Sequence, residues 1–412
     1  MLYKMKKPPI LILFRFAILF EILWGAQAWF TWWISDSRVL QYVVAFIIAF
    51  IAYKYKSRLK IRLNTSPTIM LAMLSYTIGV MFFNRGSIPS LVEVAFTLYT
   101  LWVVISDKEN TKGHLQFVCK GLAIILIPGL ILFLGKGYIP TIGPIIQKGD
   151  SGAYIFINQF FLIYRTVEWD SLSANRFHSV FLEPGYLGAM LSFMMFAVKY
   201  DFSKWYTKTL LVAQLISLSL AGYIITFVGY ILYLLSEGRN LKKIILFAIF
   251  VPIVYIAAIN YNNGNNYIND AIISRLQFDE EKGIEGNNRT GAGTDFYYNQ
   301  AVENGDIWMG LGAERVKQIN GGSSYSAGYD DNIRGAGYKV FFVTNGVICA
   351  IFFLLFYIFI AKATAPSKMF IRTSFIFLIV LTFIQAAYPT SASWIYPFTL
   401  GLLYYNQKSR VI

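Results

Sequence analysis

The sequence predicts an all-α polytopic membrane protein with about twelve transmembrane helices and two long extracytoplasmic loops that carry short helices. Three observations lead to this fold class. Hydrophobic residues make up 56% of the chain and charged residues only 14%. Apolar runs of membrane-spanning length recur along the sequence, and the polar residues collect either in short basic segments or in two long ones.

The apolar runs follow one another so closely that residues 1–412 are expected to form a single integral membrane domain. Segment 206–236 fits either one long helix or two short ones that meet near 218–222. We interpret it as two, because the basic segment 237–243 then lies on the same side as the other short basic segments. The predicted spans are 9–34, 39–53, 67–84, 88–105, 115–135, 184–199, 206–219, 221–236, 242–260, 337–361, 370–387 and 392–406.

The charge distribution predicts the orientation of these spans. The net charge is +14, and most of the lysines and arginines lie in short segments such as KYKSRLKIR (54–62). Basic residues favour the cytoplasmic side, so both termini are expected to be cytoplasmic and 9–34 to be a retained first span. This explanation of the charge makes the lipid bilayer, and not nucleic acid, the expected partner.

Several kinds of chemistry are disfavoured by the residues present. Cys119 and Cys349 both lie inside apolar runs, so neither a disulfide framework nor a zinc site is indicated. The chain has no phosphate-binding glycine loop, nucleophile elbow, zinc-protease motif or dinucleotide fingerprint. We therefore expect neither a cofactor nor a bound metal.

Function is expected to reside in the two long loops, 136–183 and 261–336, which are rich in Gly, Asn and Tyr and carry charges of both signs. Their composition favours surface loops with tight turns over a folded domain, although INDAIISRLQF and DFYYNQAVENG could each form a short helix. Arginine grips phosphate through a fixed fork of donors, and a carboxylate can take a proton from a hydroxyl. The candidate residues are Arg176, Glu183, Arg275, Arg289, Arg315, Asp330, Asp331 and Arg334.

Each candidate also has a purely structural interpretation. Glu183 also fits the residue before a helix that starts at Pro184, and Arg176 fits an interfacial anchor or the ion-pair partner of Glu183. His178 is expected to be a hydrogen-bonding loop residue, and the pair Asp330 and Asp331 fits an ordinary turn. Ionisable residues inside or near the ends of spans are expected to be structural ties: Arg15, Glu21, Glu93 and Lys120.

Four local patterns in this layout resemble a known family. They are RFHSVFLEPGYLGAML (176–191), LISLSLAGYIITFVGYILYLL (215–235), RTGAGTDFYYNQAVENGDIWMGLGAERV (289–316) and DDNIRGAGYKVFFVTNGVICAIFFLL (330–355). Together with the two long loops they resemble the Wzy-type O-antigen or capsular polysaccharide polymerases and, more distantly, the O-antigen ligases of the same superfamily. The ligases carry a histidine directly before the asparagine of the fourth pattern, whereas this chain has Asp331 before Asn332. This departure favours the polymerases.

The resemblance implies a metal-independent glycosyltransferase of a bacterial cytoplasmic membrane, acting on polyprenyl-diphosphate-linked oligosaccharides. It implies that Arg176 and Arg289 hold the diphosphate. We expect Arg275, Arg315 or Arg334 to assist them, and Glu183, Asp331 or Asp330 to be the base. A chain-length regulator and a flippase of the same pathway are possible partners. A ligase-like glycosyltransferase, a lipid-linked oligosaccharide flippase or other transporter, and a membrane acyltransferase remain as alternatives.

Overall fold

A computed structural model shows a bundle of helices with a few short strands. It describes residues 8–83, 88–135, 138, 146–148, 154–165, 176–238, 253, 256–257, 260–264, 269, 278–279, 283–284, 292–322, 333, 337–386 and 390–407. The bundle is made of α1 (Pro9–Gly25), α3 (Arg38–Arg58), α4 (Pro67–Phe83), α5 (Ile88–Ser106), α6 (Thr111–Leu134), α8 (Pro184–Ala197), α9 (Trp205–Ile216), α10 (Leu220–Ser236), α14 (Tyr338–Thr364), α15 (Met369–Ala386) and α16 (Ala392–Asn406).

The predominantly helical fold is confirmed, while the twelve spans stay a prediction. Among the described helices, α3, α6 and α14 are long and apolar enough to cross a membrane, and several shorter apolar helices accompany them. The predicted span 242–260 lies largely outside the described residues. Segment 206–236 forms two helices, as predicted, because Leu218 has a positive φ of 48° that ends the helical path.

The first predicted span, 9–34, is wrong in its extent. Helix α1 ends at Gly25, and Gln27 then adopts a φ of 55°, which turns the chain away from the helix axis. The chain continues as a short 3₁₀ turn, η1 (Trp29–Thr31), and a single turn of helix, α2 (Trp32–Ser35). The apolar run therefore folds as a helix followed by a tight aromatic turn, a division that apolar composition alone does not reveal.

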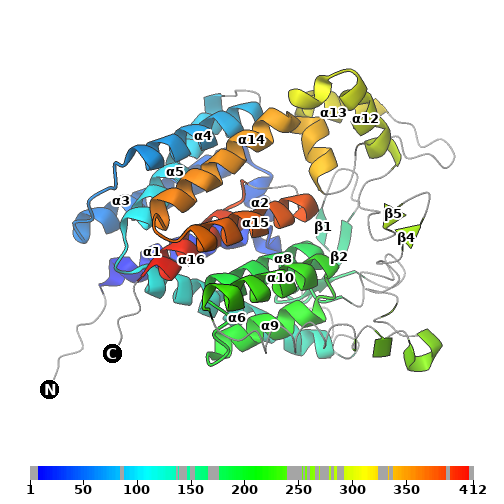
Figure 1. Ribbon diagram of the computed structural model, residues 1–412, viewed down its shortest axis with the longest axis horizontal. Coiled ribbons are helices and arrows are strands. Elements are labelled where there is room, and N and C mark those ends of the chain that lie inside the picture. Colours follow the sequence, from blue (N-terminus) through cyan, green and yellow to red (C-terminus); the bar gives the residue numbers. More distant parts are fainter. Residues whose placement is uncertain are drawn as a thin grey trace.

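The bundle has two ends with different character. At one end, α8 and α16 begin and α1 ends. The hydrogen bonds from Tyr186 to Gly25 and Ser391 show that these three helix ends are adjacent. We call this the Glu183 end. At the other, the His114 end, α1 and α6 begin and α16 finishes, since Arg15 contacts His114 and Gln407 contacts Lys108. Figure 1 shows β1, β2, α12 and α13 together on the right, at the Glu183 end.

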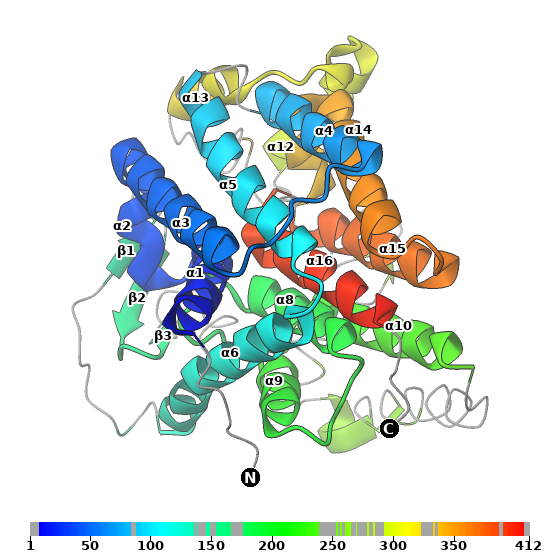
Figure 2. The same ribbon diagram turned by 90° about the vertical axis from the view of Figure 1, so that its left-hand side faces the viewer.

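Helix α8 is the centre of the bundle, as the view in Figure 2 shows. Every residue of α8 except Tyr186 is buried. Its glycine Gly188 lies against α10, where a Cβ atom would come within 2.5 Å of Ser219 Cβ, and Gly222 of α10 contacts the Gly188 backbone in return. Small residues at such a crossing let two helices approach closely, which is how helices gain packing energy in lipid.

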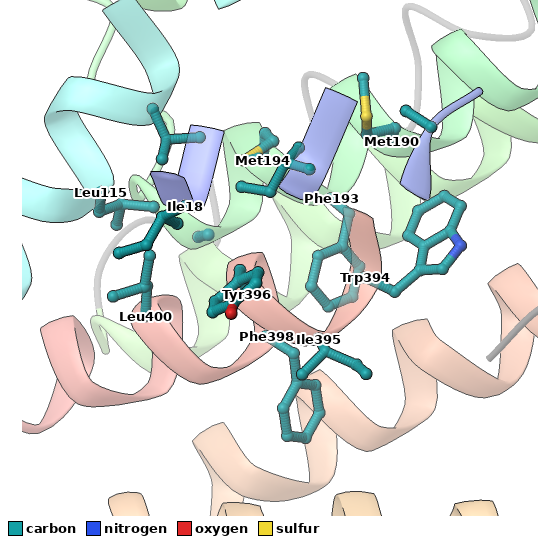
Figure 3. Packing of buried hydrophobic residues seen from close by; sticks show 14 of the residues in the cluster. Ile18, Leu115, Met190, Phe193, Met194, Trp394, Ile395, Tyr396, Phe398 and Leu400 are labelled. Atoms are coloured by element: carbon teal, nitrogen blue, oxygen red, sulfur yellow. The ribbon is translucent and has the colours of Figure 1, made fainter. Parts of the chain in front are cut away.

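Aromatic side chains fill the space between α8 and its neighbours. Figure 3 shows Trp394 and Tyr396 of α16 beside Phe193 and Met194 of α8. Phe193 and Trp394 meet edge to face, with ring centroids 6.3 Å apart. This packing fixes α16 against α8 and places the first turns of both helices at the Glu183 end.

The first long segment contains a small sheet that the sequence interpretation missed. Strands β1 (Ile146–Lys148), β2 (Tyr154–Asn158) and β3 (Ile163–Tyr164) are antiparallel in the order β1-β2-β3, with Ile146 opposite Phe156 and Ile157 opposite Tyr164. The run YIFINQFFLIY (154–164) is rich in aromatic and β-branched residues, a signal typical of strands. The expectation of loops with tight turns alone is therefore corrected here.

The second long segment carries short elements in its described parts. The helix predicted over DFYYNQAVENG is confirmed as part of α12 (Ala292–Glu303), which is followed by η7 (Asp306–Trp308) and α13 (Ala313–Gly322). The helix expected over INDAIISRLQF lies almost wholly outside the described residues. The other described elements are η3 (Tyr261–Gly264), β4 (Phe278–Asp279) and β5 (Gly283–Ile284).

Candidate functional site

Glu183 stands directly before α8, at the positive end of its helix dipole. Pro184 occupies the first helical position, where its missing N–H group costs nothing, so the predicted helix start is confirmed. The Glu183 side chain makes no capping hydrogen bond. By contrast, Ser219 and Ser391 do cap α10 and α16 with their side chains. The Glu183 carboxylate is partly exposed and makes no hydrogen bond or ion pair within the described chain.

The backbone that leads to Glu183 is held rigidly. Trp29 N–H donates to Val180 O at 2.8 Å, and Ile163 N–H donates to Ser179 O at 2.9 Å. The turn after α1 and strand β3 therefore both hydrogen-bond to the backbone at 179–180. His178 is buried, and its Nδ1 donates to Phe181 O at 2.6 Å. A ring nitrogen that donates to a carbonyl cannot accept a proton, which agrees with the prediction that His178 is a hydrogen-bonding loop residue.

Arg176 is anchored beside the first turn of α8. Its Nε donates to Ser217 O at 3.3 Å, in the elbow between α9 and α10. In the same elbow, Ser219 Oγ donates to Gly185 O at 3.4 Å. The elbow thus links the arginine to the start of α8, while no ion pair joins Arg176 and Glu183 in this part of the structure. The predicted alternative, in which Arg176 is simply the ion-pair partner of Glu183, does not hold.

A cluster of hydroxyl groups lies one turn beyond Glu183, and the sequence interpretation did not identify it. Tyr186 OH lies 2.9 Å from Gly25 O, 3.1 Å from Ser391 Oγ and 2.5 Å from Ser393 Oγ. Ser391 Oγ also donates to Gly25 O at 2.6 Å. Ser391 and Ser393 precede an apolar run and indicate only a helix cap in the sequence; their meeting with Tyr186 requires the fold. The hydroxyl cluster joins α1, α8 and α16 beside the candidate site.

The third and fourth sequence patterns come together at α14. Gly346 has non-helical φ and ψ of 83° and 162°, which breaks the helix. Leu311 N–H donates to Val343 O at 2.7 Å and Gly312 N–H donates to Thr344 O at 2.8 Å, so the turn after η7 satisfies carbonyls near the break. A salt bridge of 2.7 Å between Lys339 Nζ and Asp295 Oδ1 fastens α12 to the first turn of α14.

Among the remaining candidate residues, Arg315 alone lies in the described part of the chain, and it is not gathered with Arg176 and Glu183. Arg315 is exposed on α13, with no described contact to either of them. Among the described residues, no group of three or more His, Cys, Asp or Glu side chains could hold a metal ion. Candidates that lie outside the described residues are Arg275, Arg289, Asp330, Asp331 and Arg334.

A second group of ionisable residues lies buried at the His114 end. Asp107 Oδ2 accepts from His114 Nε2 at 2.9 Å and from Tyr55 OH, while Asn110 N–H and Nδ2 donate to Asp107 Oδ1 at 3.3 and 3.1 Å. Arg15 Nε donates to His114 Nδ1 at 3.4 Å. Burial alone would raise the pKa of Asp107, but the hydrogen bonds from His114 and Tyr55 outweigh it and hold that pKa below its ordinary value.

Three of the four residues predicted to be structural ties make contacts between helices. Arg15 joins α1 to α6, and Glu21 accepts a hydrogen bond from Tyr396 of α16. Lys120 lies over the ring of Tyr206, 5.9 Å from its centroid. All three connect neighbouring helices, as expected, whereas the Glu93 side chain makes no hydrogen bond or ion pair within the described chain.

Comparison with protein families, with characterised proteins and with solved structures finds no significant match to this chain. The geometry of the Glu183 end is therefore the basis for assigning a function.

Proposed function

We propose that the protein is a membrane-embedded, metal-independent glycosyltransferase that polymerises a surface polysaccharide. In this reaction the growing glycan leaves one polyprenyl diphosphate and is joined to a new lipid-linked repeat unit. The Glu183 end would face away from the cytoplasm, with both termini on the cytoplasmic side. The cellular location that goes with this activity is a bacterial cytoplasmic membrane.

The proposed step forms one glycosidic bond and breaks one. A hydroxyl oxygen of the incoming repeat unit attacks the anomeric carbon of the growing glycan, and the bond from that carbon to the diphosphate oxygen breaks. Glu183 takes the hydroxyl proton. Arg176, next to the positive end of the α8 dipole, stabilises the negative charge that accumulates on the departing diphosphate.

The observation that carries the proposal is the pairing of an anchored arginine with an unengaged carboxylate at one helix start. Arg176 is fixed by its hydrogen bond to Ser217 O. The Glu183 carboxylate oxygens accept no hydrogen bond within the described chain, so they are available to take a proton. A purely structural glutamate at a helix start would be expected to cap the helix or pair with a nearby arginine. Arg289, Asp330 and Asp331 remain proposed contributors from the second long segment.

The activity can be tested with the purified full-length protein in lipid vesicles. Supplied with a polyprenyl-diphosphate-linked repeat unit, it is expected to produce longer lipid-linked chains without nucleotide and in the presence of a metal chelator. Glu109→Gln and Arg62→Ala are suitable control variants, because both residues are exposed and lie outside the proposed site.

Two results would contradict the proposal. One is a failure to elongate the lipid-linked unit by protein that is folded and correctly inserted. The other is movement of the intact unit across the vesicle membrane without elongation, which would identify the alternative activity of a flippase. Transfer to a different lipid acceptor in place of a second repeat unit would identify a ligase.

A further inference from the structure

The turn from Asp306 to Gly312 lies deeper along the bundle than its place in a loop suggests. Backbone atoms of the turn touch the break in α14, since a Cβ atom at Gly346 would come within 2.4 Å of Trp308 O and 2.5 Å of Met309 C. Gly346 lies five residues beyond Phe341 along α14. α14 bends sharply at Gly346, since Phe341 before the break and Phe353 beyond it meet with ring centroids 6.5 Å apart, and the turn therefore lies at the bend of α14.

Contacts between α4 and α14 show where the break in α14 lies along the apolar helix α4. Phe83, the last residue of α4, meets Phe341 with ring centroids 6.1 Å apart. One helical turn earlier, Gly79 O accepts a hydrogen bond from Cys349 Sγ at 3.3 Å. Gly346 lies three residues before Cys349, about 4.5 Å of helical rise, so Gly346 and the turn that touches it lie close to the last turn of this apolar helix. Figure 1 and Figure 2 both place α12 and α13 beside the ends of α4 and α14.

The surfaces near this level are apolar and uncovered. Trp308 is 56% exposed and Met309 is 54% exposed. On α4, Met81 of the last turn is exposed, and on α14 the exposed residues Ile351 and Leu354 continue away from the break. Spacings of three and four residues put such side chains on one helix face, which is the face that a membrane helix presents to lipid.

The turn also has the composition of a membrane interface. The Trp308 indole N–H has no hydrogen-bond partner in the described chain, so it is available to lipid headgroups or water while the ring contacts acyl chains. Polar residues follow at once on α13, where Glu314, Arg315 and Lys317 are exposed. The apolar side chains of the turn therefore lie near the end of α4, and charged side chains follow them in the sequence on α13.

We propose that the turn Asp306–Gly312 is a membrane-inserting element, and that Trp308 and Met309 enter the outer region of the lipid leaflet beside α4 and α14. The partner is the acyl-chain and headgroup boundary of the bilayer itself. Gly310 and Gly346 make this depth possible, because their bare backbones allow the turn to reach into the helix break. The inference is independent of the proposed glycosyl transfer.

Site-directed fluorescence tests this element. Cys119 and Cys349 are fully buried, so an introduced cysteine can be labelled selectively in the folded full-length protein. Met309→Cys and Trp308→Cys are labelled separately with a polarity-sensitive fluorophore and reconstituted into phosphatidylcholine–phosphatidylglycerol vesicles. Ile351→Cys is the lipid-facing reference and Glu303→Cys the exposed polar reference, with unmodified protein as the labelling blank.

The expected result is a blue-shifted emission for Met309→Cys, close to that of Ile351→Cys, and strong quenching by lipids that carry a nitroxide near the top of the acyl chain. Trp308→Cys should behave in the same way, which guards against a local disturbance in one variant. If both labels show the emission and the aqueous iodide quenching of Glu303→Cys, the turn does not enter the bilayer and the proposal is wrong.

Discussion

The two ends of the bundle use ionisable residues in opposite ways. At the His114 end, the Asp107 carboxylate is buried and accepts hydrogen bonds from His114, Tyr55 and Asn110. At the Glu183 end, the Glu183 carboxylate is partly exposed and engages no described donor, although Arg176 is anchored nearby. A fully satisfied carboxylate holds helices together, whereas an unengaged one at a helix start is available for chemistry.

This difference shows that a charge in an apolar sequence does not by itself indicate function. Both ends place an arginine and a carboxylate in or beside apolar runs: Arg15 lies inside one and Asp107 follows one, whereas Arg176 and Glu183 precede one. Only the fold shows that the first pair is bridged by His114 and sealed from solvent. Single substitutions at the two ends test this difference.

The largest effect is expected for Glu183→Gln. Loss of a general base should lower the polymerisation rate by about 100-fold to 10,000-fold, since glutamine cannot take the hydroxyl proton. The thermal unfolding midpoint should stay close to that of the unmodified protein, because no hydrogen bond is lost. A polymerisation time course gives the rate, with Glu109→Gln as the matched control. An unchanged rate would transfer the role of base to Asp330 or Asp331.

Asp107→Asn should have the largest effect on stability. Breaking a buried charged network is expected to cost about 3–5 kcal/mol, because Arg15 keeps its charge without the carboxylate. Reaction of Cys119 and Cys349 with a thiol-reactive dye reports unfolding, since both are buried in the folded protein. An unfolding curve that matches that of Glu109→Gln would show that the network does not stabilise the bundle.

The contribution of Asp107 should also depend on pH. Because its pKa in the folded protein is below the ordinary value of 3.8, its stabilising effect is complete above that value and is lost as the pH falls through the lower folded value. The difference in unfolding midpoint between wild type and Asp107→Asn should therefore be constant near neutral pH and shrink in strong acid. A difference that grows on acidification would contradict this account.

Arg176→Ala is expected to lower the polymerisation rate by about 100-fold to 1,000-fold, the usual cost of removing one donor to a developing negative charge. Arg176→Lys should recover part of the rate, because lysine keeps the charge but not the guanidinium fork. Initial rates over a range of lipid-linked substrate concentrations separate binding from turnover. Equal rates for Arg176→Ala and the exposed control Arg62→Ala would exclude Arg176 from the site.

The smallest effect is expected at the helix break, which is structural although it lies at the Glu183 end. Gly346→Ala and Gly305→Ala both place a side chain at positive φ, which costs about 1–2 kcal/mol. Only Gly346 also meets the Trp308 backbone, whereas a Cβ at Gly305 meets nothing within 4 Å. Gly346→Ala should therefore unfold at the lower temperature and expose Cys349, three residues away, to thiol reagents. Equal behaviour of the two variants would show that the turn does not pack against the break.

The sequence predicts the helices well because each is a long apolar run bounded by capping or turn residues. It also predicts the start of α8 from Glu183 and Pro184, and the helix after Arg289. It does not predict that α1 stops at Gly25, because the following residues remain apolar and the turn is held by a distant segment, with Trp29 N–H donating to Val180 O. Long-range pairings such as Ala28 with Phe181 have no local signal.

The candidate site is predicted only in part for the same reason. Arg176 and Glu183 are close in sequence, so their shared location at one helix start follows from local patterns. The elbow that anchors Arg176 and the hydroxyl cluster around Tyr186 join segments that are far apart in sequence. The full satisfaction of Asp107 likewise requires α3, α6 and the connection before α6 to meet.

The most direct measurement determines the polymerisation rate and the unfolding midpoint of Glu183→Gln and Asp107→Asn in the same vesicle preparation. Glu183→Gln is expected to lose polymerisation activity and keep its unfolding midpoint, while Asp107→Asn is expected to unfold at a lower midpoint and keep its polymerisation rate per folded molecule. A variant pair in which Glu183→Gln polymerises normally, or in which Asp107→Asn abolishes polymerisation without loss of stability, would contradict the central claim that the two ends divide chemistry and stability between them.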